Sequence, residues 1–299
     1  MISIQDEFST LTQVIIGRGS PYQQDKRQVA AEMRQFPLVP DTARKAEVLA
    51  LAYPTEEILK REYADYVRTL ESYGVEVLLA DPKAAYSFDY TCPRDIGFVI
   101  GDIFFIANMA VPSRVDEIKT IQHHLDQIES AKVQRPPAGA LLEGGDVVML
   151  DANTVLVGYH QRSNHAGYEY LRECLTPLGI STIPVRHSRL HLDCCLNPLG
   201  MGHLLIHPES LHDNDETTWR ALNKCAWIEV DAVEREHLAT NILSVNPTTI
   251  ISRNHSSCAR INQLLRSLGY TVEAIGFDGV PATGGSLRCA SLPLRRKRG

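Results

Sequence analysis

A strand–turn–strand unit followed by a helix recurs along this chain of 299 residues. The unit is clearest at 146–157, where an Asp-Ala-Asn turn separates two apolar runs, and again at 242–251 around Asn246 and Pro247. Amphipathic patterns typical of helices cover 55–73, 115–128 and 254–268. Because two strands, a helix and a returning strand repeat several times, the sequence predicts a pseudo-symmetric α/β fold.

Composition limits the class of protein. The apolar fraction of 44% and the charged fraction of 22% are those of an ordinary globular chain. A net charge of −6 argues against a general nucleic-acid surface, and we interpret the basic stretch 295–298 as solvated. No apolar run approaches the ~18 residues of a membrane helix. The chain has no low-complexity linker, so we expect residues 1–299 to form one domain in a soluble protein.

The seven cysteines are odd in number and none forms a Cys-x-x-Cys pair, which predicts reduced thiols. The N-terminus has neither the basic start nor the apolar run of a signal peptide, so we expect a cytoplasmic protein. His123 and His124 are adjacent in a helical pattern and do not share a face, and His203 and His207 have no acidic or cysteine ligand close by. The set His187, His191 and Cys194 shares His191 with a His-x-Asp motif at 191–193. We therefore predict no metal and no organic cofactor.

Four short motifs carry side chains capable of chemistry. Pro-Arg-Asp ends at Asp95, Glu-Gly-Gly-Asp begins at Glu143, and His-x-Asp begins at His191; each lies where a strand should end. The fourth is a glycine-rich loop that leads to Cys289. Each motif alone has an ordinary explanation, because glycines favour turns and a cysteine is usually a small buried hydrophobe.

Together the motifs fit the chemistry of a guanidinium group, which is flat, cationic and weakly electrophilic. Asp95 and Asp193 could bind its nitrogen edges and present its carbon to a nucleophile. A thiolate from Cys289 is a suitable attacking group near neutral pH. His191 could protonate the departing nitrogen, with Glu143 orienting the imidazole.

These segments resemble the guanidino-group-modifying superfamily, which includes arginine deiminase, dimethylarginine dimethylaminohydrolase and glycine amidinotransferase. The resemblance covers essentially the whole chain and implies the pentein fold, a five-bladed ββαβ propeller. It assigns Cys289 as nucleophile, His191 as acid–base, and Glu143 as the partner of His191. It also assigns Asp95 and Asp193 to guanidinium binding.

The resemblance implies three further substrate contacts. Arg114 and Arg162 lie where deiminase-like members bind the substrate α-carboxylate, and each follows a motif carboxylate by the same 19 residues. Asp89 is predicted as an additional polar contact. Other arginines, such as Arg18 and Arg189, do not follow a motif carboxylate at this spacing and are interpreted as surface residues.

The expected activity, as in arginine deiminase, is hydrolysis of the guanidino group of arginine or an arginine derivative to citrulline and ammonia, through a covalent thiouronium on Cys289. The loop after Cys289 is similar to that of arginine deiminase, whereas the Pro-Arg-Asp segment is similar to that of amidinotransferases. A transferase must shield its intermediate from water, and this compact chain has no long insertion that could serve as a lid, which favours hydrolysis.

Amidino transfer to an amine is the alternative. The non-enzymatic alternative is the ribosome-binding factor of the same fold. The expected partner is a small guanidino compound, and a homo-oligomer is left open.

Overall fold

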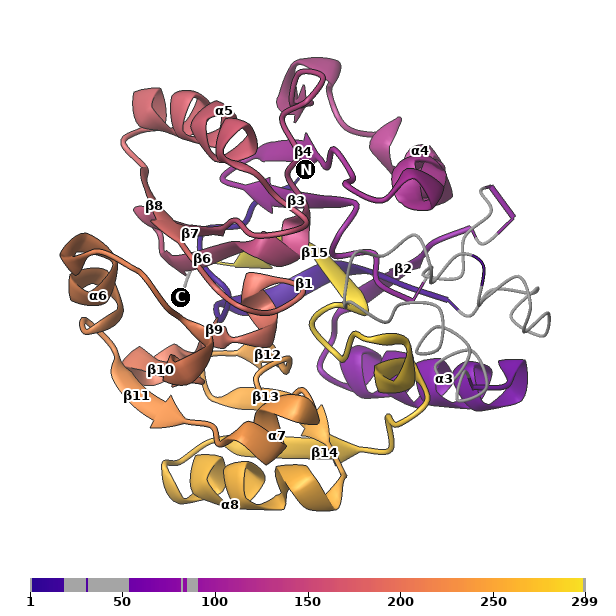
Figure 1. Ribbon diagram of the computed structural model, residues 1–299. Coiled ribbons are helices and arrows are strands. Elements are labelled where there is room, and N and C mark those ends of the chain that lie inside the picture. The colour runs from indigo at the N-terminus through magenta and orange to yellow at the C-terminus, as the bar shows by residue number, and fades with distance from the viewer. Residues whose placement is uncertain (1, 19–30, 32–53, 82, 85–90, 298–299) are drawn as a thin grey trace.

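Five three-stranded sheets make up the core of the computed structural model, which describes residues 2–18, 31, 54–81, 83–84 and 91–297. In every sheet the middle strand pairs antiparallel with one neighbour and parallel with the other. A helix precedes the parallel strand in each unit. The predicted α/β arrangement of five ββαβ units is therefore confirmed, and Figure 1 shows its helices around the outside and the sheets converging on the centre.

The units, called blades below, follow one another around the molecule. Blade 1 contains β15 (Ser291–Lys297), β1 (Thr10–Ile16), α3 (Glu56–Ser72) and β2 (Glu76–Leu79). Blade 2 contains β3 (Gly97–Ile100), β4 (Ile103–Ile106), α4 (Gln122–Leu125) and β5 (Val133–Gln134). Blade 3 contains β6 (Val147–Asp151), β7 (Thr154–Gly158), α5 (His165–Leu175) and β8 (Ser181–Val185).

Blades 4 and 5 have the same order. Blade 4 contains β9 (Leu196–Pro198), β10 (His203–Ile206), α6 (Glu216–Leu222) and β11 (Ala226–Glu229), and the short helix α7 (Ala232–Glu236) leads out of it. Blade 5 contains β12 (Leu243–Asn246), β13 (Thr249–Arg253), α8 (Ala259–Ser267) and β14 (Thr271–Ile275). The first strand of each sheet faces the centre, where β15 lies against β3 and β6 against β9.

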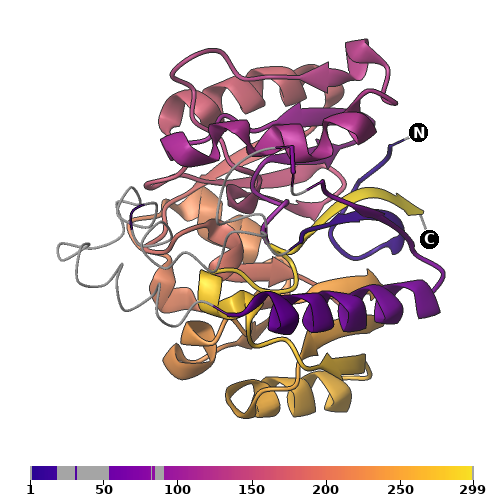
Figure 2. The same cartoon turned by 90° about the vertical axis from the view of Figure 1, so that its right-hand side faces the viewer.

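Blade 1 joins the two ends of the chain. The C-terminal strand β15 pairs antiparallel with β1, so that Val14 lies opposite Pro293 and Ile16 opposite Ser291. Figure 2 shows the N- and C-termini on the same side of the molecule, next to this sheet. The strand that follows Cys289 therefore closes the ring of blades, which brings the C-terminal cysteine loop beside residues near the start of the chain.

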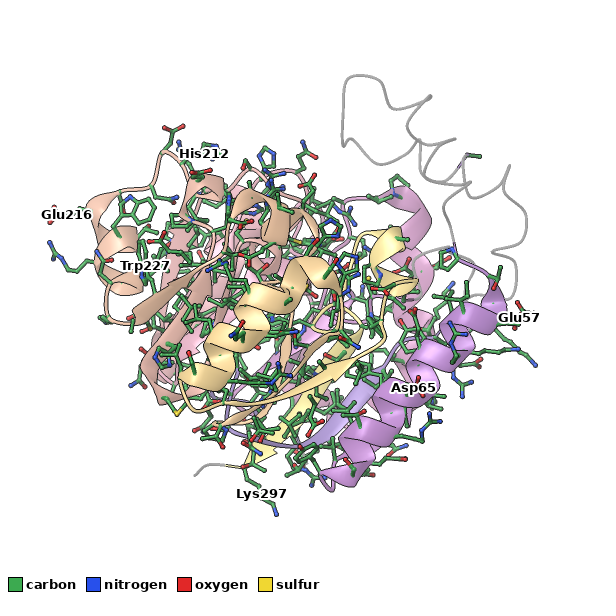
Figure 3. The ribbon with its side chains drawn as sticks, turned by 90° about the horizontal axis from the view of Figure 1, so that it is seen from below. Glu57, Asp65, His212, Glu216, Trp227 and Lys297 are labelled. Carbon is green, nitrogen blue, oxygen red and sulfur yellow. The ribbon has the colours of Figure 1, made fainter. Side chains whose placement is uncertain are left out.

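Helix α3 forms as the sequence predicts and supports two loops of the centre. The side chain of Thr55 caps it, Glu56 and Glu57 fill its first turn, and Gly74 adopts a positive φ of 74° beyond its end. Figure 3 shows Glu57 projecting from α3 away from the rest of the molecule. On the buried side, the hydroxyls of Tyr63 and Tyr66 donate to the carbonyls of Thr91 (2.8 Å) and Leu287 (2.9 Å).

The predicted helix 115–128 differs from the structure. Residues Pro112–Ile121 form a 3₁₀-helix, and α4 covers only Gln122–Leu125. Residues three apart eclipse one another in a 3₁₀-helix, which here places Glu117 against the Arg114 guanidinium. Ile121 and Leu125 are buried as predicted, but Val115 is 54% exposed, so its assignment to the apolar stripe was wrong.

The apolar core divides into four clusters, each formed by the faces of neighbouring sheets and the helix that covers them. Among the helices in the described ranges, none combines the length and the apolar character that crossing a bilayer requires.

Candidate active site

The four predicted motifs lie in the loops that lead from one blade to the next, just before a central strand begins rather than where a strand ends, as the sequence had suggested. Asp95 lies two residues before β3, and Cys289 lies two residues before β15. Glu143 lies shortly before β6, and His191 and Asp193 precede β9. Since the five central strands surround one axis, these loops meet at one place although the residues are far apart in the sequence.

The imidazole of His191 lies between two carboxylates. Its Nε2 is 2.8 Å from Glu143 Oε2, and its Nδ1 is 3.6 Å from Asp95 Oδ1. All three side chains are buried. Glu143 Oε1 also accepts a hydrogen bond from the backbone N–H of Ala110 (2.9 Å), which fixes the carboxylate that orients the ring.

The electrostatics of this group favour a charged histidine. Burial alone would lower the pKa of His191, but the negative charge of Asp95 and the hydrogen bond to Glu143 outweigh it and raise the pKa to about 10. Burial would raise the pKa of Glu143, but Arg162 and His191 outweigh it and hold that pKa well below its usual range. At neutral pH the group is an imidazolium held by carboxylates, and it can donate a proton.

Cys289 lies beside Asp193, the second carboxylate of the His-x-Asp motif. Its sulfur is 3.6 Å from Asp193 Oδ2 and 3.1 Å from the amide nitrogen Nδ2 of Asn241. Cys289 is only 3% exposed, but its sulfur contacts polar groups rather than an apolar interior. Among the side chains that the structure describes, no hydrogen bond joins the Cys289 sulfur to His191; Asp193, two residues after His191, lies beside the sulfur.

Arg114 and Arg162 pair with the motif carboxylates that precede them by 19 residues. Arg114 donates from a terminal nitrogen to Asp95 Oδ2 (2.9 Å), and Arg162 donates from Nε to Glu143 (3.1 Å to Oε2). Both arginines are fully buried. The equal spacing therefore has a structural cause, because blades 2 and 3 each pair a loop carboxylate with an arginine that follows the second strand. Binding of a substrate α-carboxylate by these arginines stays a prediction.

A second buried network supports Asp193 and was not found in the sequence. Arg288 donates to Asp193 Oδ2 (2.6 Å) and to Glu7 Oε1 (2.9 Å), and Arg94 lies 3.8 Å from Glu7 Oε2. Burial would raise the pKa of Glu7, but the charges of Arg288 and Arg94 lower it to about 2. Glu7 is 281 positions from Arg288, and no local pattern could have joined them.

Asn241 was also missed. It lies two residues before β12, at the position in blade 5 that Asp95 occupies in blade 2 and Cys289 in blade 1. The only signal in the sequence is its place immediately before the strand–turn–strand unit at 242–251. Asp89, the remaining predicted contact, lies outside the described residues.

The Glu-Gly-Gly-Asp motif shapes the site. Asp146 Oδ1 accepts from the backbone N–H of Leu192 (2.9 Å) and Oδ2 accepts from Ser163 Oγ (2.7 Å), so Asp146 fixes the loop that carries His191. Gly145 has no room for a side chain, because a Cβ there would lie 2.6 Å from His191 Cγ and 2.9 Å from Asp95 Oδ1. The second glycine therefore lets these two groups approach each other.

We expect Gly145→Ala to reduce turnover by about a hundredfold, because the added methyl group displaces His191 and Asp95 from each other. Gly276→Ala is the matched control, since a Cβ at Gly276 meets nothing within 4 Å. Turnover of both purified variants would be measured beside their circular dichroism spectra. Full activity in Gly145→Ala would show that this close packing has no part in catalysis.

Among the residues that the structure describes, one group has the proximity needed for a metal ion. Ligand atoms of Asp95, Glu143 and His191 all lie within 4.8 Å of one another. However, Arg114 and Arg162 already neutralise the two carboxylates, and the raised pKa of His191 opposes the neutral imidazole that a metal needs. His187, considered as a ligand from sequence, instead contacts Asp146 (3.1 Å). The absence of a metal stays a prediction.

Comparison with known proteins identifies the family. A sequence model described as N,N-dimethylarginine dimethylhydrolase (DDAH), eukaryotic, matches residues 44–296. The chain belongs to the DDAH family. The resemblance to the guanidino-modifying superfamily that the motifs predicted is therefore confirmed, and the DDAH family places this chain among enzymes that modify amidines.

Two relatives show the range of the match. The Bacillus subtilis protein YkgA, described as uncharacterized, is 32% identical over 237 residues, which cover 79% of each chain. An arginine deiminase of Listeria innocua is 26% identical over 252 residues, covering 68% of this chain and 60% of the deiminase. The chain thus spans less than two thirds of that deiminase.

Solved structures confirm the pentein fold. An inosamine-phosphate amidinotransferase of Streptomyces griseus has a TM-score of 0.80 at 18% identity and covers 100% of this chain and 98% of its own. DDAH from Pseudomonas aeruginosa, in complex with citrulline, has a TM-score of 0.70 at 20% identity, over 95% of this chain and 99% of that one. At these identities the likeness concerns the fold, which hydrolases and transferases of the superfamily share.

Proposed function

We propose that this protein hydrolyses the guanidino group of arginine or an N-substituted arginine, through a covalent intermediate on Cys289. One observation carries the proposal: a buried thiol lies 3.6 Å from the Asp193 carboxylate, in the same group of loops that holds His191 between Glu143 and Asp95. A thiol, two guanidinium-binding carboxylates and a protonated histidine are the parts that this reaction requires.

Asp95 and Asp193 would bind the guanidinium, since each already accepts a hydrogen bond from a guanidinium of the chain, Arg114 and Arg288 respectively. Asp95 Oδ1 has no hydrogen-bond partner among the described groups and faces His191 Nδ1. A substrate nitrogen bound to Asp95 Oδ1 would therefore lie next to the proton that His191 donates. We assign the acid function to Nδ1, because Glu143 holds Nε2.

In the first half-reaction the Cys289 thiol loses its proton to water, and the thiolate forms a C–S bond to the guanidinium carbon. His191 transfers its Nδ1 proton to one nitrogen, the C–N bond breaks, and that nitrogen leaves as ammonia or as an alkylamine. The product on the enzyme is an S-linked thiouronium. The negative charges of Asp95 and Asp193 stabilise its positive charge.

In the second half-reaction water attacks the thiouronium carbon. His191, now neutral, accepts a proton from that water while Glu143 keeps the ring oriented. The C–S bond then breaks and Cys289 leaves as thiolate; the remaining hydroxyl proton passes to solvent, and the neutral urea group of citrulline is released. The same atoms serve arginine and N-methylated arginines, which differ only in the amine that leaves.

Product analysis separates hydrolysis from its alternatives. The protein would be incubated with arginine, N,N-dimethylarginine and agmatine, with and without an added amine, and the products identified by mass spectrometry. Citrulline formed without an added amine is the expected result. Ornithine that appears only with an amine acceptor would identify an amidinotransferase. No turnover and no Cys289 adduct with a haloacetamidine would instead support the non-enzymatic, ribosome-binding role.

Arg162 provides a second test, because its position supports two roles. Arg162→Ala is expected to lower kcat about tenfold on both arginine and agmatine, since Glu143 loses its ion pair. Binding of the substrate α-carboxylate would add a rise in KM for arginine alone, because agmatine has no carboxylate. Arg172→Ala, which removes an exposed arginine paired with Glu169, is the control. An unchanged kcat together with an unchanged KM on both substrates would remove Arg162 from the site.

The redox state of the cysteines indicates the cellular compartment of the protein. All seven cysteines are free, which fits a reducing compartment, and we infer a cytoplasmic protein. Detection of native disulfides in protein isolated from its source without reductant would contradict this inference.

A further inference from the structure

The amide of Asn241 holds the backbone of the loop that carries the nucleophile. Its Oδ1 accepts hydrogen bonds from the backbone N–H groups of Cys289 (3.0 Å) and Ser286 (3.2 Å). A backbone N–H can only donate, so the oxygen of the amide has to face these two groups. The NH₂ end is thereby directed at the Cys289 sulfur, 3.1 Å away.

Blade 4 fixes the position of Asn241. The amide of Asn197 donates to the carbonyls of Thr240 (3.0 Å) and Ile242 (2.8 Å), which flank Asn241 in the sequence. The Thr240 hydroxyl donates to the carbonyl of Cys194 (3.0 Å). All of these side chains are buried. Asn241 is therefore held by its own backbone, and its amide does not depend on substrate for its orientation.

A neighbouring thiol shows what the amide adds. Cys194 and Cys289 both lie 3.6 Å from an oxygen of Asp193, and both are buried. Burial and the charge of Asp193 raise the pKa of Cys194 well above its ordinary value. Only Cys289 also has a side-chain N–H donor at its sulfur among the described hydrogen bonds. Two thiols beside one carboxylate thus differ in the group that can stabilise a thiolate.

We propose that Asn241 is a further catalytic residue, whose amide N–H donates to the Cys289 sulfur and stabilises the thiolate before attack and when it leaves. The inference rests on the proposed role of Cys289 as nucleophile. A thiolate beside Asp193 experiences like-charge repulsion, which the substrate cation relieves only while it is bound. A neutral donor opposes this repulsion in the resting protein without competing for the guanidinium.

Two substitutions separate donation from support of the loop. Asn241→Asp keeps the size of the side chain and the oxygen that accepts from Cys289 and Ser286, but it replaces the donor with a second acceptor. Asn241→Ala removes both functions. If Asn241 only supported the loop, Asn241→Ala would leave the midpoint of the pH profile of Cys289 alkylation unchanged. If it donates to the thiolate, Asn241→Asp has the larger defect.

The readout is alkylation of Cys289 by iodoacetamide between pH 6 and pH 10, followed by mass spectrometry of the peptide that contains it. This measurement needs no substrate. At pH 7 we expect the alkylation rate to fall about tenfold in Asn241→Ala and further in Asn241→Asp, with the midpoint of the pH profile moving upward in both. Any order in which Asn241→Asp is not the slower of the two variants overturns the inference.

Asn262→Ala is the matched control, because Asn262 is a buried asparagine of the same blade that bonds to Ser252 and Arg253 away from the sulfur. It is expected to lower the melting temperature and leave the alkylation profile unchanged. Turnover is measured on the same samples. A protein that shows the expected alkylation order but converts no guanidine keeps Asn241 as the donor that stabilises the Cys289 thiolate and loses the hydrolase proposal, so the two failures are distinguishable.

Discussion

Cys289→Ser is expected to reduce turnover by about four orders of magnitude or more while leaving the fold intact. Serine occupies nearly the same volume as cysteine, so the buried loop before β15 can retain its contacts with Asn241 and Asp193. A serine hydroxyl, however, does not ionise near neutral pH, and the adjacent Asp193 carboxylate opposes an alkoxide. The measurement is kcat on arginine or dimethylarginine, together with the melting temperature.

Cys194→Ser is the control for this experiment, because Cys194 is buried and contacts the same Asp193 carboxylate. We expect it to keep turnover within about tenfold of the unmodified protein, since burial and Asp193 raise the pKa of this thiol and leave it unreactive. If Cys289→Ser retained more than about a hundredth of the activity, the nucleophile assignment would be wrong.

His191→Asn is expected to lower turnover of arginine by about 10²- to 10⁴-fold, the range associated with a positioned general acid. Arg162 and Arg114 still pair with Glu143 and Asp95 in this variant, so no buried carboxylate is left without a cation. An analogue with an S-methyl isothiourea in place of the guanidine tests the role directly, because its thiolate leaving group needs no proton. The burst of methanethiol should be affected far less than the release of ammonia.

The protonation of His191 also sets an expectation for pH. Burial opposes the imidazolium, but Asp95 and Glu143 raise its pKa from 6.5 to about 10. A raised pKa in the folded state gives stability that is fully present below pH 6.5 and is lost as the pH rises through about 10. The melting temperature should therefore fall at alkaline pH, and less steeply in His191→Asn. An equally steep fall in both proteins would contradict the assignment.

Much of the fold follows from local sequence signals. The strands at 147–151 and 154–158 and the helix Glu56–Ser72 appear where apolar periodicity and capping residues predict them. The 3₁₀-helix Pro112–Ile121 was not predicted, because its geometry depends on the ion pairs of Arg114 with Glu117 and Asp95. Apolar periodicity alone cannot reveal the ion pair with Asp95, because Asp95 belongs to another loop.

The site was predictable where its residues form motifs and not where they stand alone. Asp95, Glu143 and His191 come together as the motifs imply. Asn241 is a single asparagine before a strand, and its partner Cys289 is 48 positions away. Arg288 is next to the nucleophile, but its ion-pair partner Glu7 lies near the start of the chain. These contacts form only when β15 pairs with β1 and closes the ring of blades, so a local sequence pattern cannot reveal them.

The covalent step is the central claim, and mass spectrometry of acid-quenched protein tests it most directly. Protein mixed with arginine or dimethylarginine would be quenched during turnover, digested, and each cysteine peptide weighed. On the peptide that contains Cys289 we predict an added mass equal to the substituted amidino group that the substrate leaves on the sulfur. This added mass should be absent from the Cys289→Ser variant and from protein without substrate. Turnover to citrulline with no adduct on Cys289 at any quench time, or an adduct on another cysteine, would contradict it.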